Sequence, residues 1–238
     1  MGCTQAKIQQ DTSLDNEINK KSTTSNDCLK VNHEFERKPS ANSKTKSHLV
    51  KYTLTKDEKA ILQKHWESTV LVQIPDLFLR TMLNSIKESP KLLDVINCRM
   101  GDPNIADLCE WPKLKCMARG NCNFFTKQII ENHLEEPLVR NDSEVLGAIH
   151  IKYSPYGFKP TFLDIWHSNI LKLINEGVTF SNENEKEKFM SAFTKLAHFL
   201  ITILIVEYED HMKSVRLHDR EVNKTQNEVS STICSGGF

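Results

Sequence analysis

Residues 146–163 read LGAIHIKYSPYGFKPTFL and contain the end of one predicted helix, a tight connection and the start of the next. Leu146 and His150 are four residues apart, so a helix presents both side chains on one face. Ser154-Pro155 ends this helix, because a residue before proline avoids the helical region. Pro160 has the position of a residue that opens a helix. The stretch therefore predicts a histidine in the last turns of one helix, close to the start of another.

Helical periodicity continues on both sides of this stretch. Thr55-Lys-Asp-Glu58 has the spacing of a capping box, and apolar residues at helical intervals follow it. The periodicity predicts helices that begin near these positions: Thr55, Pro75, Leu92, Trp111, Asn141, Pro160 and Glu185, the last of them ending near Arg216. No run alternates with period two between hairpin turns. We therefore expect an all-α domain of six to eight helices over residues 53–216.

Two polar extensions flank the predicted domain. Residues 1–52 are rich in Ser, Thr, Asn, Lys and Gln, a composition that buries too little apolar surface to offset the entropy lost on ordering. We expect them to form a disordered arm, and residues 217–238 to form a disordered tail. The longest apolar run, Leu196 to Val206, is interrupted by His198 and is shorter than the roughly 20 residues that cross a bilayer.

Bulk composition limits the partners and the compartment that we expect. Lys plus Arg and Asp plus Glu both number 31, so overall charge predicts no nucleic-acid partner. The 7 cysteines are irregularly spaced and form no CxxC pair, which argues against a disulfide framework or a zinc site. The N-terminal residues lack the apolar segment of a secretion signal, so the reducing cytosol is the expected compartment.

Several marker residues occur in the order that is typical of one helical family. Trp66 lies in the first predicted helix, and Pro90 opens a short helix that leads to Ile96. Leu146-Gly-Ala-Ile-His150 is then followed by Tyr156-Gly-Phe158-Lys-Pro160. In these features the chain resembles the globins, from about Thr55 to Arg216. The resemblance implies a globin fold that binds haem b.

The resemblance also implies roles for individual residues. His150 matches the proximal histidine, which ligates the haem iron, and Leu146 precedes it by four residues as in globins. Phe158 is expected to press on the haem edge, and Ile96 to pack on the haem face, where most globins have phenylalanine. Neutral imidazole is the usual donor to haem iron, and one histidine suffices when a helix and an apolar pocket hold the cofactor.

The distal side of the expected haem departs from the familiar globin pattern. If Leu114, Phe125 and Ile129 point inward, Met117 lies where globins usually have histidine or glutamine. A shift of one residue puts Ala118 there instead. Neither side chain donates a hydrogen bond, so we expect no distal imidazole to stabilise bound oxygen. The Met117 thioether either ligates the iron, which would favour electron transfer, or fills the pocket as an apolar side chain.

Other interpretations of the histidines and of the domain remain open. A lone histidine is more often a surface or core residue than a ligand. Four more histidines have this simpler interpretation: His65, His133, His167 and His198. A globin-like interaction module without haem is the alternative function, which Ile96 and the missing distal histidine would allow. An enzyme is a third interpretation, but the sequence contains neither a reductase segment nor an acid/base pair that would support it.

The N-terminus, Met1-Gly2-Cys3, predicts a membrane anchor. Gly2 can carry myristate after removal of the methionine, and Cys3 can carry palmitate, although Ala6 replaces the preferred Ser or Thr. One acyl chain anchors only marginally, so Cys3 would supply the second signal. Five basic residues without an intervening acid could add attraction to anionic lipid: Arg37, Lys38, Lys44, Lys46 and Lys51.

An acylated arm joined to such a domain resembles the divergent, nematode-type globins. The resemblance implies a haem protein on the cytoplasmic face of a membrane, most simply the plasma membrane; without acylation the chain would be cytoplasmic. The iron would bind or sense O2 or another diatomic gas, or exchange an electron with a redox or signalling protein, and bulk oxygen storage is not expected.

Overall fold

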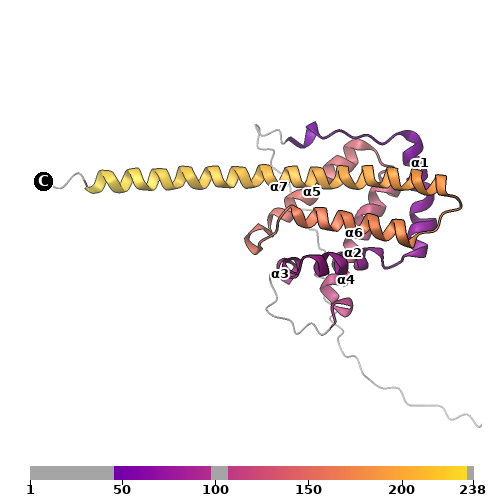
Figure 1. The fold of residues 1–238 in the computed structure, drawn as a ribbon. Coiled ribbons are helices and arrows are strands. Elements are labelled where there is room, and N and C mark those ends of the chain that lie inside the picture. Colours follow the sequence, from indigo (N-terminus) through magenta and orange to yellow (C-terminus); the bar gives the residue numbers. More distant parts are fainter. Residues whose placement is uncertain (1–45, 98–106, 235–238) are drawn as a thin grey trace, which may run out of the picture.

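The computed structural model describes residues 46–97 and 107–234, with side chains up to Leu217 and at Arg220. Every regular element in these ranges is helical (Figure 1), which confirms the expected all-α class. The seven α-helices are α1 (Lys56–His65), α2 (Leu77–Glu88), α3 (Lys91–Asn97), α4 (Pro112–Thr126), α5 (Glu136–Ile151), α6 (Thr161–Gly177) and α7 (Glu183–Cys234). Short turns supplement them: η1 (Lys46–Leu49), η2 (Trp66–Leu71), η3 (Leu108–Glu110), η4 (Lys127–Glu131) and η5 (Ser154–Tyr156).

The capping box at the start of α1 is confirmed. The Thr55 hydroxyl accepts a hydrogen bond from the backbone N–H of Glu58 at 3.3 Å, and the Glu58 carboxylate accepts one from the backbone N–H of Thr55 at 2.9 Å. Two N–H groups that a helix start leaves unpaired are thereby satisfied. Lys195 of α7 also pairs with Glu58 at 2.5 Å, so the cap fixes α1 against the last helix.

The start of α5 differs from the sequence prediction. We expected a helix from about Asn141, but α5 begins at Glu136, with Pro137 in its first turn. Proline is well suited to this position, because backbone N–H groups in the first turn of a helix have no intrahelical acceptor and proline lacks the N–H. The preceding residues His133 and Leu134 adopt left-handed backbone angles, with φ of 50° and 57°, and Leu134 is fully buried. Burial of Leu134 therefore accompanies the sharp turn that separates α4 and η4 from α5.

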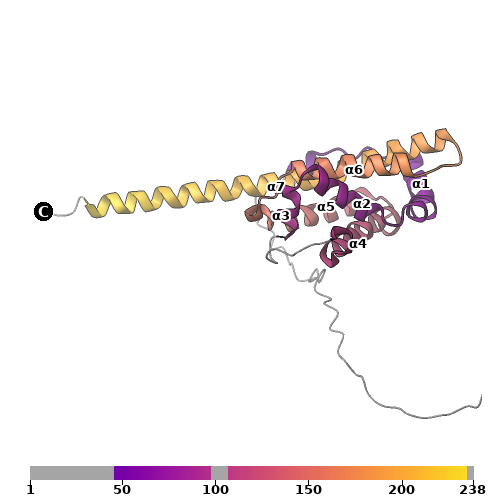
Figure 2. The same cartoon turned by 60° about the horizontal axis from the view of Figure 1, so that its bottom comes forward.

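Both expected domain boundaries also need correction. The last helix does not end near Arg216, because α7 continues to Cys234 and projects beyond the other helices (Figures 1 and 2). At the other end, the expected arm of residues 1–52 is too long. Ser47 is buried, the Arg140 guanidinium donates to the carbonyls of Ser47 and Val50, and the Tyr52 hydroxyl donates to the Leu134 carbonyl at 2.6 Å. The segment from residue 46 therefore belongs to the folded domain.

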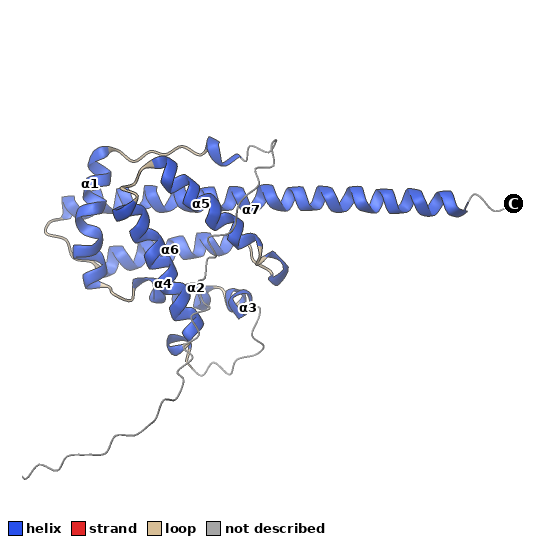
Figure 3. Cartoon of the chain, turned by 180° about the vertical axis from the view of Figure 1, so that it is seen from behind, coloured by secondary structure: helices blue, strands red, loops and turns tan. Residues whose placement is uncertain are grey.

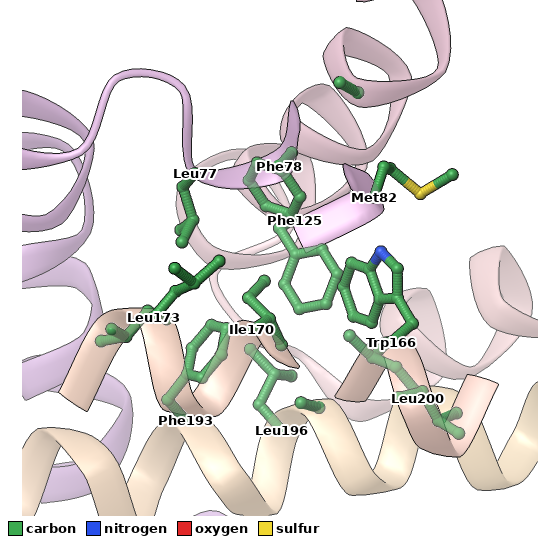
Figure 4. Close-up of a cluster of buried hydrophobic side chains, with 14 of the residues drawn as sticks. Leu77, Phe78, Met82, Phe125, Trp166, Ile170, Leu173, Phe193, Leu196 and Leu200 are labelled. Carbon is green, nitrogen blue, oxygen red and sulfur yellow. The ribbon is translucent and has the colours of Figure 1, made fainter. Parts of the chain in front are cut away.

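The apolar face of α7 forms much of the core. Phe193, Leu196 and Leu200 point from this helix toward α6 and α2 (Figure 4). Seen from behind, α7 runs along α5, its main packing partner (Figure 3). The segment Glu183–Leu217 is long and apolar enough to cross a membrane, but 56% of its most apolar stretch is buried in the domain. Its hydrophobicity is thus largely explained by packing against the other helices.

A cluster of aromatic rings connects the first helices to this core. Trp66 stacks on Phe193 with ring centroids 5.7 Å apart, and its indole N–H donates to the Thr126 hydroxyl at 2.9 Å. Phe125 lies 5.7 Å from the ring of Trp166. Each such large side chain contributes about 1.5–3 kcal/mol when it is fully removed from water. This cluster borders the cavity that contains the candidate site.

Candidate functional site

An apolar cavity of about 140 Å³ lies among α2 to α7. Its walls include all six residues that the sequence assigned to a cofactor pocket: Ile96, Met117, Phe125, Leu146, His150 and Phe158. These side chains come from three helices, α3, α4 and α5, and from the connection after α5. Their convergence does not follow from the sequence spacing of any one pair.

His150 lies in the last turn of α5, and a hydrogen bond fixes its ring. Nδ1 lies 2.8 Å from the carbonyl oxygen of Leu146, one turn earlier. Because a carbonyl only accepts hydrogen bonds, Nδ1 must carry the proton, and the lone pair is then on Nε2. No described residue hydrogen-bonds to Nε2. Burial holds the pKa of His150 below its ordinary value, against the smaller opposite effect of the Leu146 carbonyl. The imidazole is therefore neutral near pH 7 and can act as a donor ligand.

The connection after α5 brings an aromatic ring against His150. The ring centroids of Phe158 and His150 are 5.1 Å apart. Gly157 precedes Phe158 with φ of 87°, a left-handed conformation that favours glycine. The Tyr208 hydroxyl of α7 donates to the Phe158 carbonyl at 3.0 Å, and the two rings make an edge contact at 5.3 Å. The turn and the Tyr208 bond together fix Phe158 beside the histidine.

One stripe of α4 forms another wall of the cavity. Lys113, Met117 and Asn121 are four residues apart and all line it. Of the two residues that the sequence offered for this position, Met117 borders the cavity, whereas Ala118 is buried in the core and does not line it. The neighbouring Cys116 is disulfide-bonded, although the cysteine spacing argued against a disulfide framework, and Cys109 and Cys122 are free thiols.

Asn121 and Trp166 are among the polar side chains of the cavity that were not foreseen from the sequence. Asn121 lies one turn after Met117, and its amide N–H donates to the Met82 sulfur at 3.8 Å. Asn121 therefore adds a side-chain N–H donor to this wall beside Met117. Trp166 of α6 is a buried core residue that also lines the cavity. Extending the α4 stripe by one more turn would have found Asn121; nothing in the local sequence indicates that Trp166 reaches the site.

The other described histidines do not line this cavity. His65 is buried between α1 and α7, where Nδ1 lies 3.0 Å from the Thr69 hydroxyl and Nε2 lies 3.7 Å from Glu185. His167 and His198 face each other across α6 and α7, with ring centroids 6.4 Å apart. Within the described residues, no three His, Cys, Asp or Glu side chains form a metal-binding group.

The chemistry of the lining residues is compatible with an apolar cofactor that carries a metal. Nε2 of His150 is an available nitrogen donor, and most of the lining is aliphatic or aromatic. Gly2 and Cys3, the predicted acylation sites, lie outside the described residues. Comparisons with protein-family models and with curated proteins find no match for the chain. Any function must therefore be inferred from the cavity and its residues.

Proposed function

We propose that the chain is a haem-binding globin, with Nε2 of His150 as the proximal ligand of the iron. One observation carries this proposal. His150 lines an apolar cavity, its neutral imidazole is fixed by the Leu146 carbonyl, and its Nε2 makes no hydrogen bond to a described residue. The order of the helices and the six residues gathered around the cavity support it further. A neutral histidine that donates its one N–H to a carbonyl has a fixed orientation, and its other nitrogen becomes a more basic ligand.

The surrounding residues have separate tasks in this proposal. The Leu146 carbonyl orients the histidine, and Phe158 limits rotation of the ring by packing against it. Ile96 and Phe125 supply apolar surface that keeps water from the cofactor. Bound haem would supply an iron centre that binds a diatomic gas or exchanges an electron. Met117 lines the same cavity, where it serves as a sixth ligand or as apolar lining.

We further propose that the protein works at the cytoplasmic face of a membrane, through myristate on Gly2 and palmitate on Cys3. The support is the sequence Met1-Gly2-Cys3 and the need for two lipid signals in stable anchoring. A tethered gas sensor or electron-transfer protein would meet its signalling or redox partner at that surface. Oxygen storage would gain nothing from a tether.

Titration of the full-length chain with haem tests the proposal. We expect a Soret band that saturates at one haem per chain, and a carbonyl complex of the ferrous form. Split visible bands in the ligand-free ferrous form would identify a sixth ligand, and one broad band an open site. If no Soret band saturates at this ratio, the haem proposal is wrong and the interaction module without haem becomes the better account.

A further inference from the structure

Trp166 is a buried donor without an acceptor. Its side chain is 9% exposed, and Nε1 has no hydrogen-bond partner among the described residues. Stacking on Phe125 fixes the ring, and the edge that carries Nε1 faces Met82 (Figure 4). Buried tryptophan N–H groups usually find a partner, because a buried donor that loses water without gaining an acceptor destabilises the folded state.

Asn121 provides a second donor at the same place. Its amide N–H is directed to the Met82 sulfur at 3.8 Å, and sulfur is a weak acceptor. Asn121, Trp166 and Met82 all line the cavity and come from α4, α6 and α2. Asn121 thus contacts the Met82 thioether, and the Nε1 edge of Trp166 faces the same residue, in a cavity whose lining is mainly apolar. Neither donor has a strong acceptor among the described residues.

The location of these donors indicates what they bind. His150 comes from α5, which packs mainly on α7, whereas α2 packs on α4 and α6. A cofactor ligated by His150 would therefore have Met82, Asn121 and Trp166 on a different wall of its pocket. A small iron ligand that accepts hydrogen bonds would satisfy both donors in a site of low dielectric constant, where such bonds are strong.

We propose that Trp166 Nε1 and Asn121 Nδ2 form a two-donor site that selects iron ligands able to accept hydrogen bonds. The class comprises dioxygen and small anions such as azide or nitrite, and the site discriminates against carbon monoxide, which accepts hydrogen bonds poorly. This inference rests on the proposed haem binding and adds the ligand class to it.

Two variants of the full-length haem-loaded protein test the site: Trp166→Phe and Asn121→Leu. Each removes one donor, so the dissociation constant for azide in the ferric form should rise about tenfold, while that for carbon monoxide in the ferrous form stays unchanged. The infrared C–O stretching frequency should also rise, because fewer N–H dipoles face the bound gas. This vibrational signal is independent of any turnover.

Matched controls are available in the same chain. Trp111 is as buried as Trp166 but does not line the cavity, and Asn123 is exposed on α4. Trp111→Phe and Asn123→Leu should therefore leave the azide constant and the C–O frequency unchanged. Asn121 is only partly buried, so Asn121→Leu keeps the test valid if Trp166→Phe does not fold.

The possible results separate this proposal from the one on which it rests. If haem binds through His150 but both donor variants behave as their controls do, the two-donor site is wrong and haem binding stands. If the chain takes up no haem at all, both proposals are overturned.

Discussion

Replacing Gly147 with alanine should push α5 away from α7 and destabilise the fold. An added Cβ would lie 2.8 Å from the Cβ of Glu207, 3.2 Å from the carbonyl oxygen of Leu204 and 3.3 Å from its Cα. All three atoms belong to the backbone of α7 or are attached directly to it, so no side-chain rotation relieves the contact. Gly147 thus permits the close approach of the helix that carries His150 to the core helix.

The size of the effect follows from two opposing contributions. Alanine favours a helix over glycine by about 0.8–1 kcal/mol, whereas inserting a methyl group into a packed interface costs about 1–3 kcal/mol. The contact at Gly147 is below 3.0 Å and rigid, which places its cost in the upper part of that range. We expect a net loss of about 1–2 kcal/mol in the free energy of unfolding. Urea denaturation measures this loss as a lower midpoint at unchanged slope.

Gly177→Ala is the matched control. Its Cβ would lie 2.7 Å from the Cδ1 of Ile74, the mobile end of a side chain that can change rotamer. The free energy of unfolding should therefore change by no more than about 0.5 kcal/mol. Equal stabilities of Gly147→Ala and Gly177→Ala would refute the close crossing of α5 and α7.

Three other outcomes are expected. Burial lowers the pKa of His65, His150 and His167 below 6.5, so below that pH the unfolded chain binds protons that the folded chain does not. The free energy of unfolding should fall as the pH is lowered from about 7.5 to 5.5, and a value independent of pH over this range would contradict the burial of these rings. Met117→Leu should abolish a methionine-to-iron signal in magnetic circular dichroism if the thioether is the sixth ligand; a wild-type protein without that signal leaves Met117 as apolar lining. Gly2→Ala should move the protein from the membrane fraction to the soluble fraction of cells, and unchanged partition would exclude the acyl anchor.

The sequence predicted helix starts that depend on capping residues and prolines close to them in the chain. The Thr55 capping box, the break at Pro90 and the start of α6 after Pro160 all depend on residues within one helical turn. The start of α5 was misplaced because Pro137 can follow one helix or open the next. Burial of Leu134 in a left-handed turn accompanies the second arrangement, and that burial is a tertiary contact.

The sequence predicted six residues of the candidate site, but it did not predict the polar pair Asn121 and Trp166. Leu146 and His150 are four residues apart on one helix, so their hydrogen bond could be anticipated from the sequence. Asn121 and Trp166 belong to different helices, and their meeting around Met82 depends on how α4, α6 and α2 pack. The continuation of α7 past Arg216 was also missed, because a polar composition does not exclude a helix.

Rescue by free imidazole tests the role of His150 most directly. The full-length His150→Gly variant should lose stoichiometric haem binding, and added imidazole should restore the Soret and visible bands by occupying the vacated space. His167→Gly is the control, since His167 does not line the cavity and its loss should leave the spectrum unchanged. Haem binding by His150→Gly that equals the wild type without imidazole would contradict the assignment of His150 as the iron ligand.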